Sequence, residues 1–346
     1  MGPRMQTSKW ATINYKTFLV FLINFLATTC ISAEQGLLRL SMPDVRPNHD
    51  ESYLCVAHRL NPLEHEFIVG FQPNASAAKV HHILIYGCSL PGQLQRDTPN
   101  YVWECGEMNL IPGGSEAAGS LYGEGPVCAN GAKTTILFGW ALDAPAIELP
   151  PQVGFKIGGN SGINYLVLQV HYGNTAIFRS SPDITDNSGI NLETVSGKDN
   201  NGITKLAGIY LLLSYGYVTQ GVSKHTMECL IDEDKVIHPF RFRTHTHKLG
   251  TKVGGYRKPA GSYNNELELI GEHNPQEPQM FYPVEDKSMT ISRGDRIYAY
   301  CDYNNTRDHF VSIGPTGNDE MCNFYMMYWT ESGELLDNQD CMQYNP

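Results

Sequence analysis

Short apolar runs, separated by Gly, Pro, Asn and Asp, follow one another along most of the chain. Each run is rich in Val, Ile, Tyr, Phe and Leu, which is typical of β-strands. The sequence contains no long stretch with the periodicity of an amphipathic helix. We therefore expect an all-β protein with strands over residues 66–71, 80–86, 134–140, 165–172, 207–213, 240–246, 266–270, 296–303 and 322–329.

The number and spacing of these runs predict the domain organisation. Many short strands favour two tandem antiparallel β-sandwiches of jelly-roll-like form over a single barrel. A polar stretch at 196–202, rich in Gly and Asn, lacks apolar periodicity and is typical of a linker. We place an N-terminal domain at 34–197 and a C-terminal domain at 198–346. A second loose segment, 106–127, predicts a long surface loop between Cys105 and Cys128.

Residues 1–33 differ from the rest of the chain and predict a secretory signal peptide. Arg4, Lys9 and Lys16 precede an apolar run at 18–27, and small and polar residues follow up to Ala33. The apolar run is too short to span a bilayer, which takes roughly 20 residues. We expect cleavage near Ala33, no stable membrane anchor, and residence in the secretory pathway, in the lumen of secretory vesicles or outside the cell.

The cysteine content agrees with that compartment. Of nine cysteines, Cys30 lies in the predicted leader, and an even number in a secreted chain is typical of disulfides. Four of the eight remaining cysteines lie in each half, which predicts two bridges per half: Cys55, Cys88, Cys105 and Cys128, then Cys229, Cys301, Cys322 and Cys341. Two sequons, at Asn74 and Asn304, are compatible with glycosylation.

Composition and charge exclude several classes of function. Hydrophobic residues make up 41% and charged residues 18% of the chain, as in globular proteins. The net charge of −11 argues against nucleic acid as a partner, because nucleic acids demand clustered Lys and Arg. No glycine-rich loop of a phosphate-binding form precedes a helix.

The most informative histidines are His245 and His247, which lie in the strand-like run 240–247. Side chains two apart in a strand point the same way, about 6.5–7 Å apart, so two imidazoles can converge on one ion. An exposed pair on a sheet face is the alternative interpretation. Arg243 extends the same face, and a guanidinium there could hold a substrate carboxylate through two hydrogen bonds.

A second group of histidines comprises His81, His82 and His171. Adjacent residues in a regular strand face opposite ways, so His81 and His82 can bind one ion only where a strand ends or bends. His171 shares a strand face with Gln169, and a lone histidine there is more often structural than a ligand. Together, however, the three imidazoles could form one metal site.

Met321 adds a soft ligand to the candidate chemistry. If the run 320–325 is extended, Met321, Asn323 and Tyr325 share a face, and Cys322 points the other way. Core packing is the usual role of an isolated methionine, but a thioether suits Cu(I) better than Zn(II) or Mg(II). Two histidines with Met321, beside a site of three histidines, would make an enzyme with two copper ions.

Between Leu38 and Cys341 the sequence resembles the peptidylglycine α-hydroxylating monooxygenase family, within the wider copper type II, ascorbate-dependent monooxygenases. Six runs carry the resemblance in the expected order: 42–44 (MPD), 80–88 (VHHILIYGC), 168–173 (LQVHYG), 243–250 (RTHTHKLG), 279–284 (QMFYPV) and 319–325 (DEMCNFY). Lys248 stands where many relatives carry a third histidine.

This resemblance implies two sandwiches with a cleft between two copper sites. One copper, the electron donor, would be held by His81, His82 and His171, and the other, which meets dioxygen and substrate, by His245, His247 and Met321. Arg243, Asn323 and Tyr325 would hold the substrate's terminal carboxylate and backbone, with Gln169 and Tyr53 in the cleft. The implied disulfides are Cys55–Cys105, Cys88–Cys128, Cys229–Cys341 and Cys301–Cys322.

The implied reaction is hydroxylation of the C-terminal glycine of glycine-extended peptides, with O2 as co-substrate and ascorbate as reductant. It is the first step of peptide amidation in neuropeptide processing. Because the sequence stops at Pro346, we expect a monofunctional enzyme and a separate downstream lyase. The alternatives are a dopamine- or tyramine-type β-hydroxylase and a non-catalytic copper carrier. Met321 and the lack of an obvious general base disfavour a zinc hydrolase.

Overall fold

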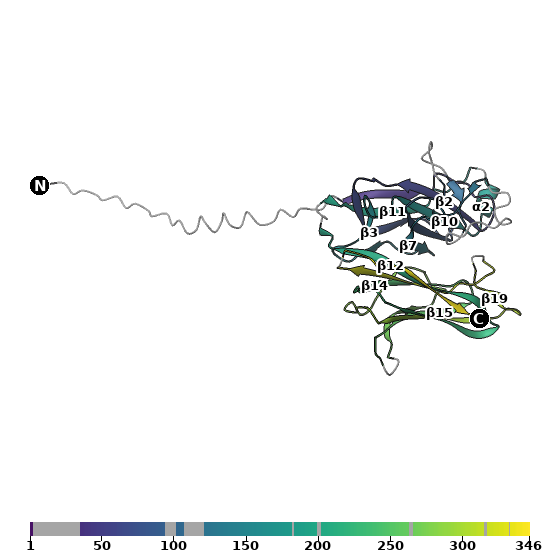
Figure 1. Ribbon diagram of the computed structural model, residues 1–346. Helices are drawn as coiled ribbons and strands as arrows, with labels where there is room; N and C mark the ends of the chain where they lie inside the picture. The colour runs from purple at the N-terminus through teal and green to yellow at the C-terminus, as the bar shows by residue number, and fades with distance from the viewer. Residues whose placement is uncertain are drawn as a thin grey trace. The chain divides into compact units, whose positions relative to one another are not determined.

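A computed structural model describes residues 1–2, 35–93, 102–106, 121–181, 183–198, 202–262, 266–314, 317–331 and 333–346. The predicted signal peptide, apart from its first two residues, and most of the predicted loop at 106–127 lie outside these residues. From Gln35 to Pro346 the chain forms one compact unit. It is built almost entirely of strands, as the apolar pattern predicts (Figure 1).

The first sheet contains six strands and carries the first group of histidines. Short helix α2 follows its strand β10. Neighbours in this sheet are antiparallel except β5 and β6. In spatial order the strands are β6 (Gly123–Glu124), β5 (Val102–Glu104), β2 (Ser52–Arg59), β10 (Tyr165–Tyr172), β4 (His82–Cys88) and β7 (Thr134–Ala141), and α2 is Ala176–Ser180.

The second sheet contains eleven strands and runs through both halves of the sequence. Strands β9 and β12 join the halves by a parallel pairing at Lys205 and Leu206. The main path is β1 (Gln35–Ser41), β11 (Gly189–Ser196), β3 (His65–Asn74), β9 (Val153–Gly158), β12 (Lys205–Val218), β20 (Asn323–Thr330), β14 (His238–His245) and β17 (Tyr282–Pro283). β8 (Ile147–Glu148) pairs with β3, whereas β19 (Val311–Ser312) and β21 (Asp340–Asn345) pair with β12.

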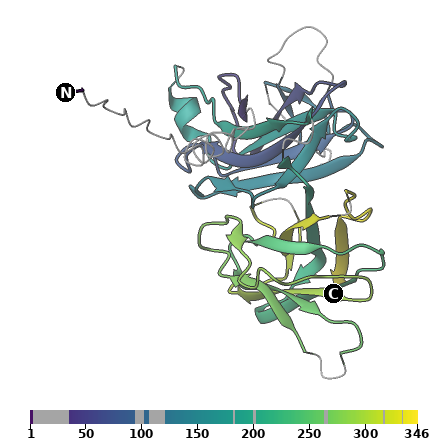
Figure 2. The same cartoon turned by 90° about the vertical axis from the view of Figure 1, so that its left-hand side faces the viewer.

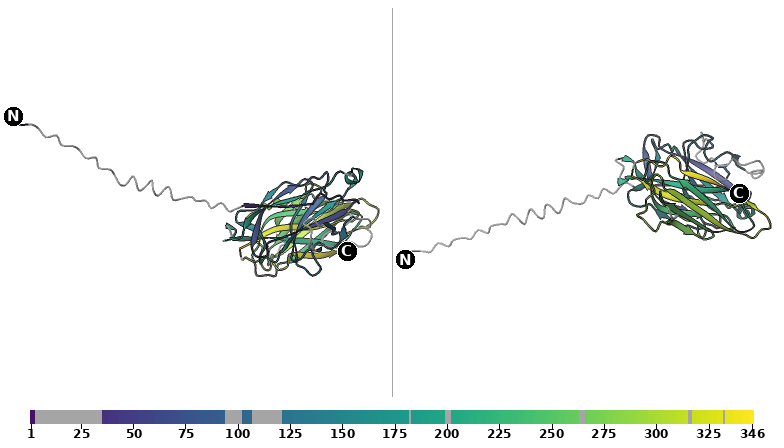
Figure 3. Two further views of the ribbon diagram at one scale, coloured as in Figure 1. Left: turned by 90° about the horizontal axis from the view of Figure 1, so that it is seen from above. Right: turned by 60° about the horizontal axis from the view of Figure 1, so that its bottom comes forward.

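The third sheet contains four antiparallel strands: β13 (Gly221–Leu230), β18 (Arg296–Asn305), β15 (Gly250–Lys258) and β16 (Glu268–His273). Most strands of the first half, coloured purple to teal, lie together in the upper part of Figure 2, and most strands of the second half, coloured green to yellow, lie in the lower part. Figure 3 shows the same strands from two further directions.

Strands β12 and β20 are buried on both faces, which explains their nearly continuous apolar sequences. Ile209 of β12 and Met327 of β20 belong to a core that also contains Phe138 of β7. Leu212 and Phe324, from the same two strands, belong to a second core with residues of the third sheet. The run 323–329 therefore lacks the apolar–polar alternation of a half-exposed strand because it packs against both halves.

The fold confirms the all-β prediction, and each expected strand overlaps an observed one. Three boundaries differ beside candidate ligands: β4 begins at His82 rather than Val80, β14 ends at His245, and β20 begins at Asn323. The sequence interpretation that His247 lies within a strand is therefore wrong. The N–H of His247 bonds to the carboxylate of Glu320, which takes it out of the β-ladder.

Each half contains two disulfides, and all four have the same partners that the resemblance implies. They are Cys55–Cys105, Cys88–Cys128, Cys229–Cys341 and Cys301–Cys322. Asn74 and Asn304, the sequon residues, are both exposed. Within the described part of the chain, no helix has the length and apolar character needed to cross a membrane.

Candidate metal centres

Three histidines meet at one end of the first sheet, where β4 begins and β10 ends. His171 of β10 pairs with His82, the first residue of β4, and the N–H of His81 donates to the carbonyl of His171 at 2.9 Å. Because His81 precedes the strand, its side chain can turn toward the same side as that of His82. The three Nδ1 atoms lie 3.1 to 3.3 Å from one another. We call these residues the tri-histidine cluster.

The geometry of this cluster fits a bound metal ion. Ligand nitrogens about 2.0–2.1 Å from one ion are themselves roughly 3.3 Å apart. Burial lowers the pKa of His81 to about 4 and also lowers the pKa of His82 and of His171. The rings are therefore neutral near pH 7, which is the form that binds metals. Three converging nitrogen donors suit copper or zinc.

Two neighbours fix the ring of His171. The Nε2 atom of His171 lies 2.8 Å from a carboxylate oxygen of Glu51, and Tyr53 stacks on the ring at 4.0 Å between centroids. This hydrogen bond lowers the pKa of Glu51, so the carboxylate stays ionised and Nε2 carries the proton. Nδ1 then keeps its lone pair for a metal, an orienting role that carboxylates commonly have beside ligand histidines.

A second group, which we call the histidine–methionine cluster, comprises His245, His247 and Met321. The ring centroids of His245 and His247 lie 5.5 Å apart. The Nδ1 atom of His245 lies 2.5 Å from Oε1 of Gln279, and that of His247 lies 3.0 Å from the carbonyl oxygen of Asp319. Since both acceptors require a proton on Nδ1, the Nε2 atoms carry the lone pairs.

The backbone of Met321 lies close to that of His247. One oxygen of the Glu320 carboxylate accepts from the backbone N–H of His247 at 2.9 Å and from that of Met321 at 3.3 Å, so the two backbones lie close together. The Sδ atom of Met321 is 3.7 Å from the amide nitrogen of Asn323. Two imidazoles and a thioether would form a soft donor set, which favours Cu(I).

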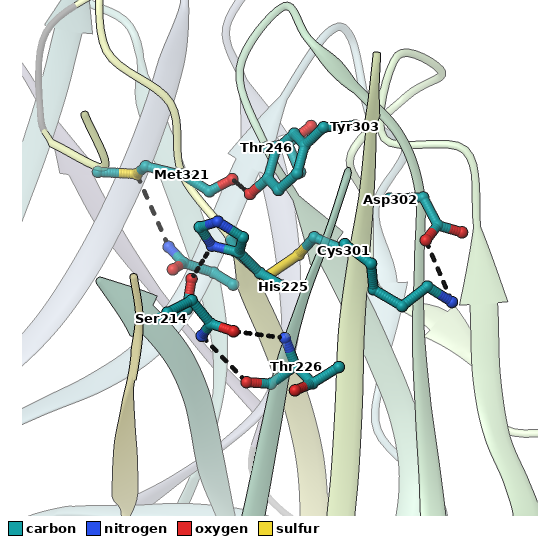
Figure 4. Close-up of a disulfide and its surroundings, with 12 residues drawn as sticks. Ser214, His225, Thr226, Thr246, Cys301, Asp302, Tyr303 and Met321 are labelled. Carbon is teal, nitrogen blue, oxygen red and sulfur yellow. Dashed lines mark hydrogen bonds and ion pairs between the residues drawn. A yellow bond between two sulfur atoms is a disulfide. The ribbon is translucent and has the colours of Figure 1, made fainter. Parts of the chain in front are cut away.

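The segment that carries Met321 is fixed on its other side as well. Tyr303 donates from its hydroxyl to the carbonyl of Met321 at 2.7 Å, and Cys322 forms the disulfide with Cys301. Figure 4 shows Met321, Tyr303 and Cys301 from neighbouring segments around this point. The face prediction also holds, because the Asn323 amide bonds both to Met321 and to the hydroxyl of Tyr325 at 3.3 Å.

Arg243 lies on β14 opposite Tyr325 of β20 and is almost fully buried. Its Nε donates to the carbonyl of Gln279 at 2.9 Å, and its guanidinium lies 5.1 Å from the centroid of the Tyr325 ring. Burial lowers the pKa of Arg243, yet a guanidinium remains charged at any physiological pH. Arg243 therefore places a fixed positive charge next to the histidine–methionine cluster.

Gln169 lies apart from these groups, although it shares a strand face with His171. It is fully buried and donates to the carbonyl of Gly106 at 2.6 Å, beside the sulfur of Cys105. Tyr53, in contrast, contacts the tri-histidine cluster directly. Of the two residues that the resemblance places in the cleft, Tyr53 therefore lies at the tri-histidine cluster and Gln169 does not.

One cavity of about 500 Å³ is bordered by both histidine groups. Its lining includes the five imidazoles together with Glu51, Tyr53, Lys79, Lys248 and Gln279. Gln279 connects the cavity to Arg243, because its Oε1 also lies 3.3 Å from Nη2 of Arg243. The cavity has space for a small reductant or the end of a peptide between the two groups.

Sequence reasoning missed the residues that orient these ligands. Glu51, Gln279 and Glu320 each form a side-chain hydrogen bond to a candidate ligand residue, yet none forms part of a ligand-spacing pattern. Gln279 begins one of the runs that carry the family resemblance, and Glu320 directly precedes Met321.

Comparison with known proteins agrees with both groups of histidines. Residues 38–179 match the N-terminal domain, and residues 205–346 the C-terminal domain, of the copper type II ascorbate-dependent monooxygenases. The two matched regions contain the tri-histidine cluster and the histidine–methionine cluster, respectively.

Individual relatives point the same way. Peptidyl-glycine alpha-amidating monooxygenase A of Xenopus laevis is 36% identical over 310 residues, covering 88% of this chain and 29% of the frog protein. Peptidylglycine alpha-amidating monooxygenase of Rattus norvegicus is 35% identical over 316 residues, covering 90% of this chain and 29% of the rat protein. DBH-like monooxygenase protein 1 of Gallus gallus is 27% identical over 309 residues, covering 82% of this chain and 45% of the chicken protein.

The chain thus spans less than a third of the length of these amidating relatives. Across that span it has matches to both domains of one copper-dependent enzyme family, in order and with few residues between them. The chain therefore belongs to the copper type II, ascorbate-dependent monooxygenase family.

Proposed function

We propose that this chain hydroxylates the α-carbon of the C-terminal glycine of peptides. The observation that carries the proposal is the single cavity bordered by five imidazoles, with Met321 beside one pair of them. The balanced reaction consumes one O2 and two ascorbate anions and yields peptidyl-α-hydroxyglycine, water and two semidehydroascorbate radicals. The curated relatives with the higher identities are named as peptidylglycine amidating monooxygenases, which supports this substrate class.

In this proposal the tri-histidine cluster would hold one copper ion, and the histidine–methionine cluster would hold a second one on the side of Arg243. Copper supplies one-electron redox chemistry and the activation of dioxygen. Glu51 keeps the lone pair of His171 on Nδ1, and Gln279 keeps that of His245 on Nε2. Both donor sets are neutral, which allows the sites to hold Cu(I) as well as Cu(II).

Substrate orientation falls to Arg243, with Asn323 and Tyr325 beside it. A guanidinium binds a carboxylate through two charge-assisted hydrogen bonds, which fixes direction as well as position. Arg243 is buried and already contacts Gln279 and Tyr325, so its charge is held in place before substrate arrives. Holding the glycine in one orientation directs oxidation to one carbon.

Cleavage of hydroxyglycine to the amide is a separate reaction, which we propose is performed by a distinct lyase active site. The chain itself would act as the hydroxylase alone. We place the division between its two domains near residues 197–198, the N-terminal leader at 1–33, and the protein in the lumen of the secretory pathway. Four disulfides support an oxidising compartment.

An amine β-hydroxylase is the second candidate function, favoured by the 27% identity to DBH-like monooxygenase protein 1. An amine substrate lacks the carboxylate that Arg243 would bind. The two functions are separated by incubating the purified protein with copper, ascorbate and a glycine-ended peptide, in parallel with tyramine and dopamine. We expect the peptide alone to gain one oxygen in the mass spectrum. Oxidation of the amines with an unchanged peptide would overturn the proposal.

A further inference from the structure

Glu320 carries a buried carboxylate between the two backbone segments that bear His247 and Met321. Its side chain is fully buried. Oε1 accepts from the N–H of Leu249 at 2.6 Å, and Oε2 accepts from the N–H of His247 at 2.9 Å and from that of Met321 at 3.3 Å. One carboxylate therefore satisfies three backbone donors from two segments of the chain.

These three donors lie just beyond the end of a β-ladder. Strands β14 and β20 pair as far as His245 and Asn323, and neither His247 nor Met321 has a ladder partner across that pair. Buried backbone N–H groups need acceptors, and leaving one unpaired costs about 1–3 kcal/mol. Glu320 supplies the acceptors at the point where the ladder stops. It thereby links His247 and Met321, which strand pairing does not connect.

The other groups around this point are already engaged elsewhere. The carbonyl of Asp319 accepts from the ring of His247 at 3.0 Å, and the carbonyl of Met321 accepts from Tyr303 at 2.7 Å. Among the described residues, no basic side chain forms an ion pair with Glu320. The three N–H groups are thus the hydrogen-bond donors to this buried carboxyl group.

We infer that Glu320 is a positioning residue for the histidine–methionine cluster, holding His247 and Met321 at the separation that one metal ion requires. This inference rests on the proposed function, which assigns those residues as copper ligands. Its chemistry requires two acceptor oxygens. A carboxamide in the same place presents one oxygen and one N–H2 group, and that N–H2 group would face a backbone donor.

The test compares wild-type protein with Glu320→Gln, each loaded with Cu(I). Copper content is measured by competition with a chelator, and X-ray absorption reports sulfur scattering from Met321. We expect Glu320→Gln to lose about 10- to 100-fold in copper affinity at this cluster. The sulfur signal should weaken, and the tri-histidine cluster should bind copper as before. Two tightly bound coppers with the wild-type sulfur signal would overturn the inference.

Asp295→Asn is the matched control. Asp295 is a buried carboxylate in the same half of the chain, and it accepts from Arg257 and from the backbone N–H groups of Ser292 and Ala260. Losing it should lower the melting temperature without weakening the sulfur signal. If Asp295→Asn and Glu320→Gln lose the sulfur signal equally, Glu320 acts through general stability and the inference fails.

Glu320→Asp covers the case in which Glu320→Gln does not fold. It keeps the charge but shortens the reach by one methylene, so partial recovery of affinity and sulfur signal is expected. Full wild-type affinity in this variant would contradict the inference. If neither variant folds, rapid hydrogen exchange at the amides of His247 and Leu249 in wild-type protein would overturn it, and slow exchange would support it. Wild-type protein without any sulfur signal would refute the assigned ligands instead.

Discussion

The two candidate metal centres are built in different ways. In the tri-histidine cluster, His82 and His171 are paired residues of neighbouring strands and His81 directly precedes one of those strands. Their three nitrogens already lie within 3.1 to 3.3 Å of one another. The histidine–methionine cluster takes its donors from the point where β14 and β20 stop pairing: His245 is in the last ladder pair, and His247 and Met321 lie beyond it. Strand pairing sets the first geometry, whereas side-chain hydrogen bonds set the second.

The orienting groups differ in the same way. Glu51 bonds directly to a ligand ring and borders the open cavity, and its backbone adopts a left-handed φ of 58°. Glu320 bonds to backbone N–H groups and is fully buried. Where paired strands already position the ligand rings, the carboxylate only selects which ring nitrogen carries the lone pair. Where the ligands lie at and beyond the strand ends, the carboxylate positions the backbone that bears them.

The largest expected effect comes from removing the thioether, which only the histidine–methionine cluster contains. Met321→Ile keeps an apolar side chain of similar size at this buried position but removes the soft ligand. We expect turnover to fall by roughly 1,000-fold or more, while the tri-histidine cluster still takes up copper. Ascorbate-dependent oxygen consumption and copper content provide the measurement. Activity close to wild type would show that Met321 is not a ligand.

Arg243→Ala tests whether the same cluster is the one that receives the substrate. Losing a two-fold charge-assisted contact of about 2–3 kcal/mol should raise KM for glycine-ended peptides by roughly 30- to 150-fold. The matched control is Arg241→Ala on the same strand, where the guanidinium bonds to the backbone carbonyl of Phe281. If the unmodified enzyme oxidised a C-terminally amidated peptide as efficiently as the same peptide with a free carboxylate, the proposed contact with Arg243 would be disproved.

Glu51→Gln sharpens the comparison from the side of the tri-histidine cluster. A carboxamide still reaches His171 but no longer stabilises the required tautomer by charge. We expect about a tenfold loss of copper affinity at this cluster and little change in peptide KM. Chelator competition measures the affinity. Asp50→Asn serves as control, because Asp50 pairs with Arg179 instead of a histidine. Equal losses in both variants would remove the special role of Glu51.

The smallest expected effect concerns the cavity rim. The chain has a net charge of −11, which repels the ascorbate anion. Lys79 and Lys248 border the cavity, and we expect their positive charges to offset this repulsion locally. Lys248→Gln should lower kcat/KM for ascorbate by about two- to threefold and reduce its salt dependence. Lys252→Gln is the control, since Lys252 pairs with Glu272 on the third sheet. A change in peptide KM alone would place the role of Lys248 with the substrate.

The sequence alone determined the class of fold and the identity of the candidate ligands. Strand-length apolar runs and eight cysteines after residue 33 indicated the fold class, because composition and periodicity are properties of the linear chain. The ligands followed from the resemblance of the runs around His81, His171, His245 and Met321 to one enzyme family. The strand boundaries were predictable only to within a few residues, and they differ at the ligands, where side-chain hydrogen bonds replace ladder bonds.

Only the tertiary structure decided how the ligands are held. The parallel pairing of β9 with β12 makes one sheet of both halves, and one cavity receives histidines from each. Glu51 and Glu320 reach residues 120 and 73 positions away in the sequence. No local pattern encodes such contacts, because they depend on where separate strands end in space.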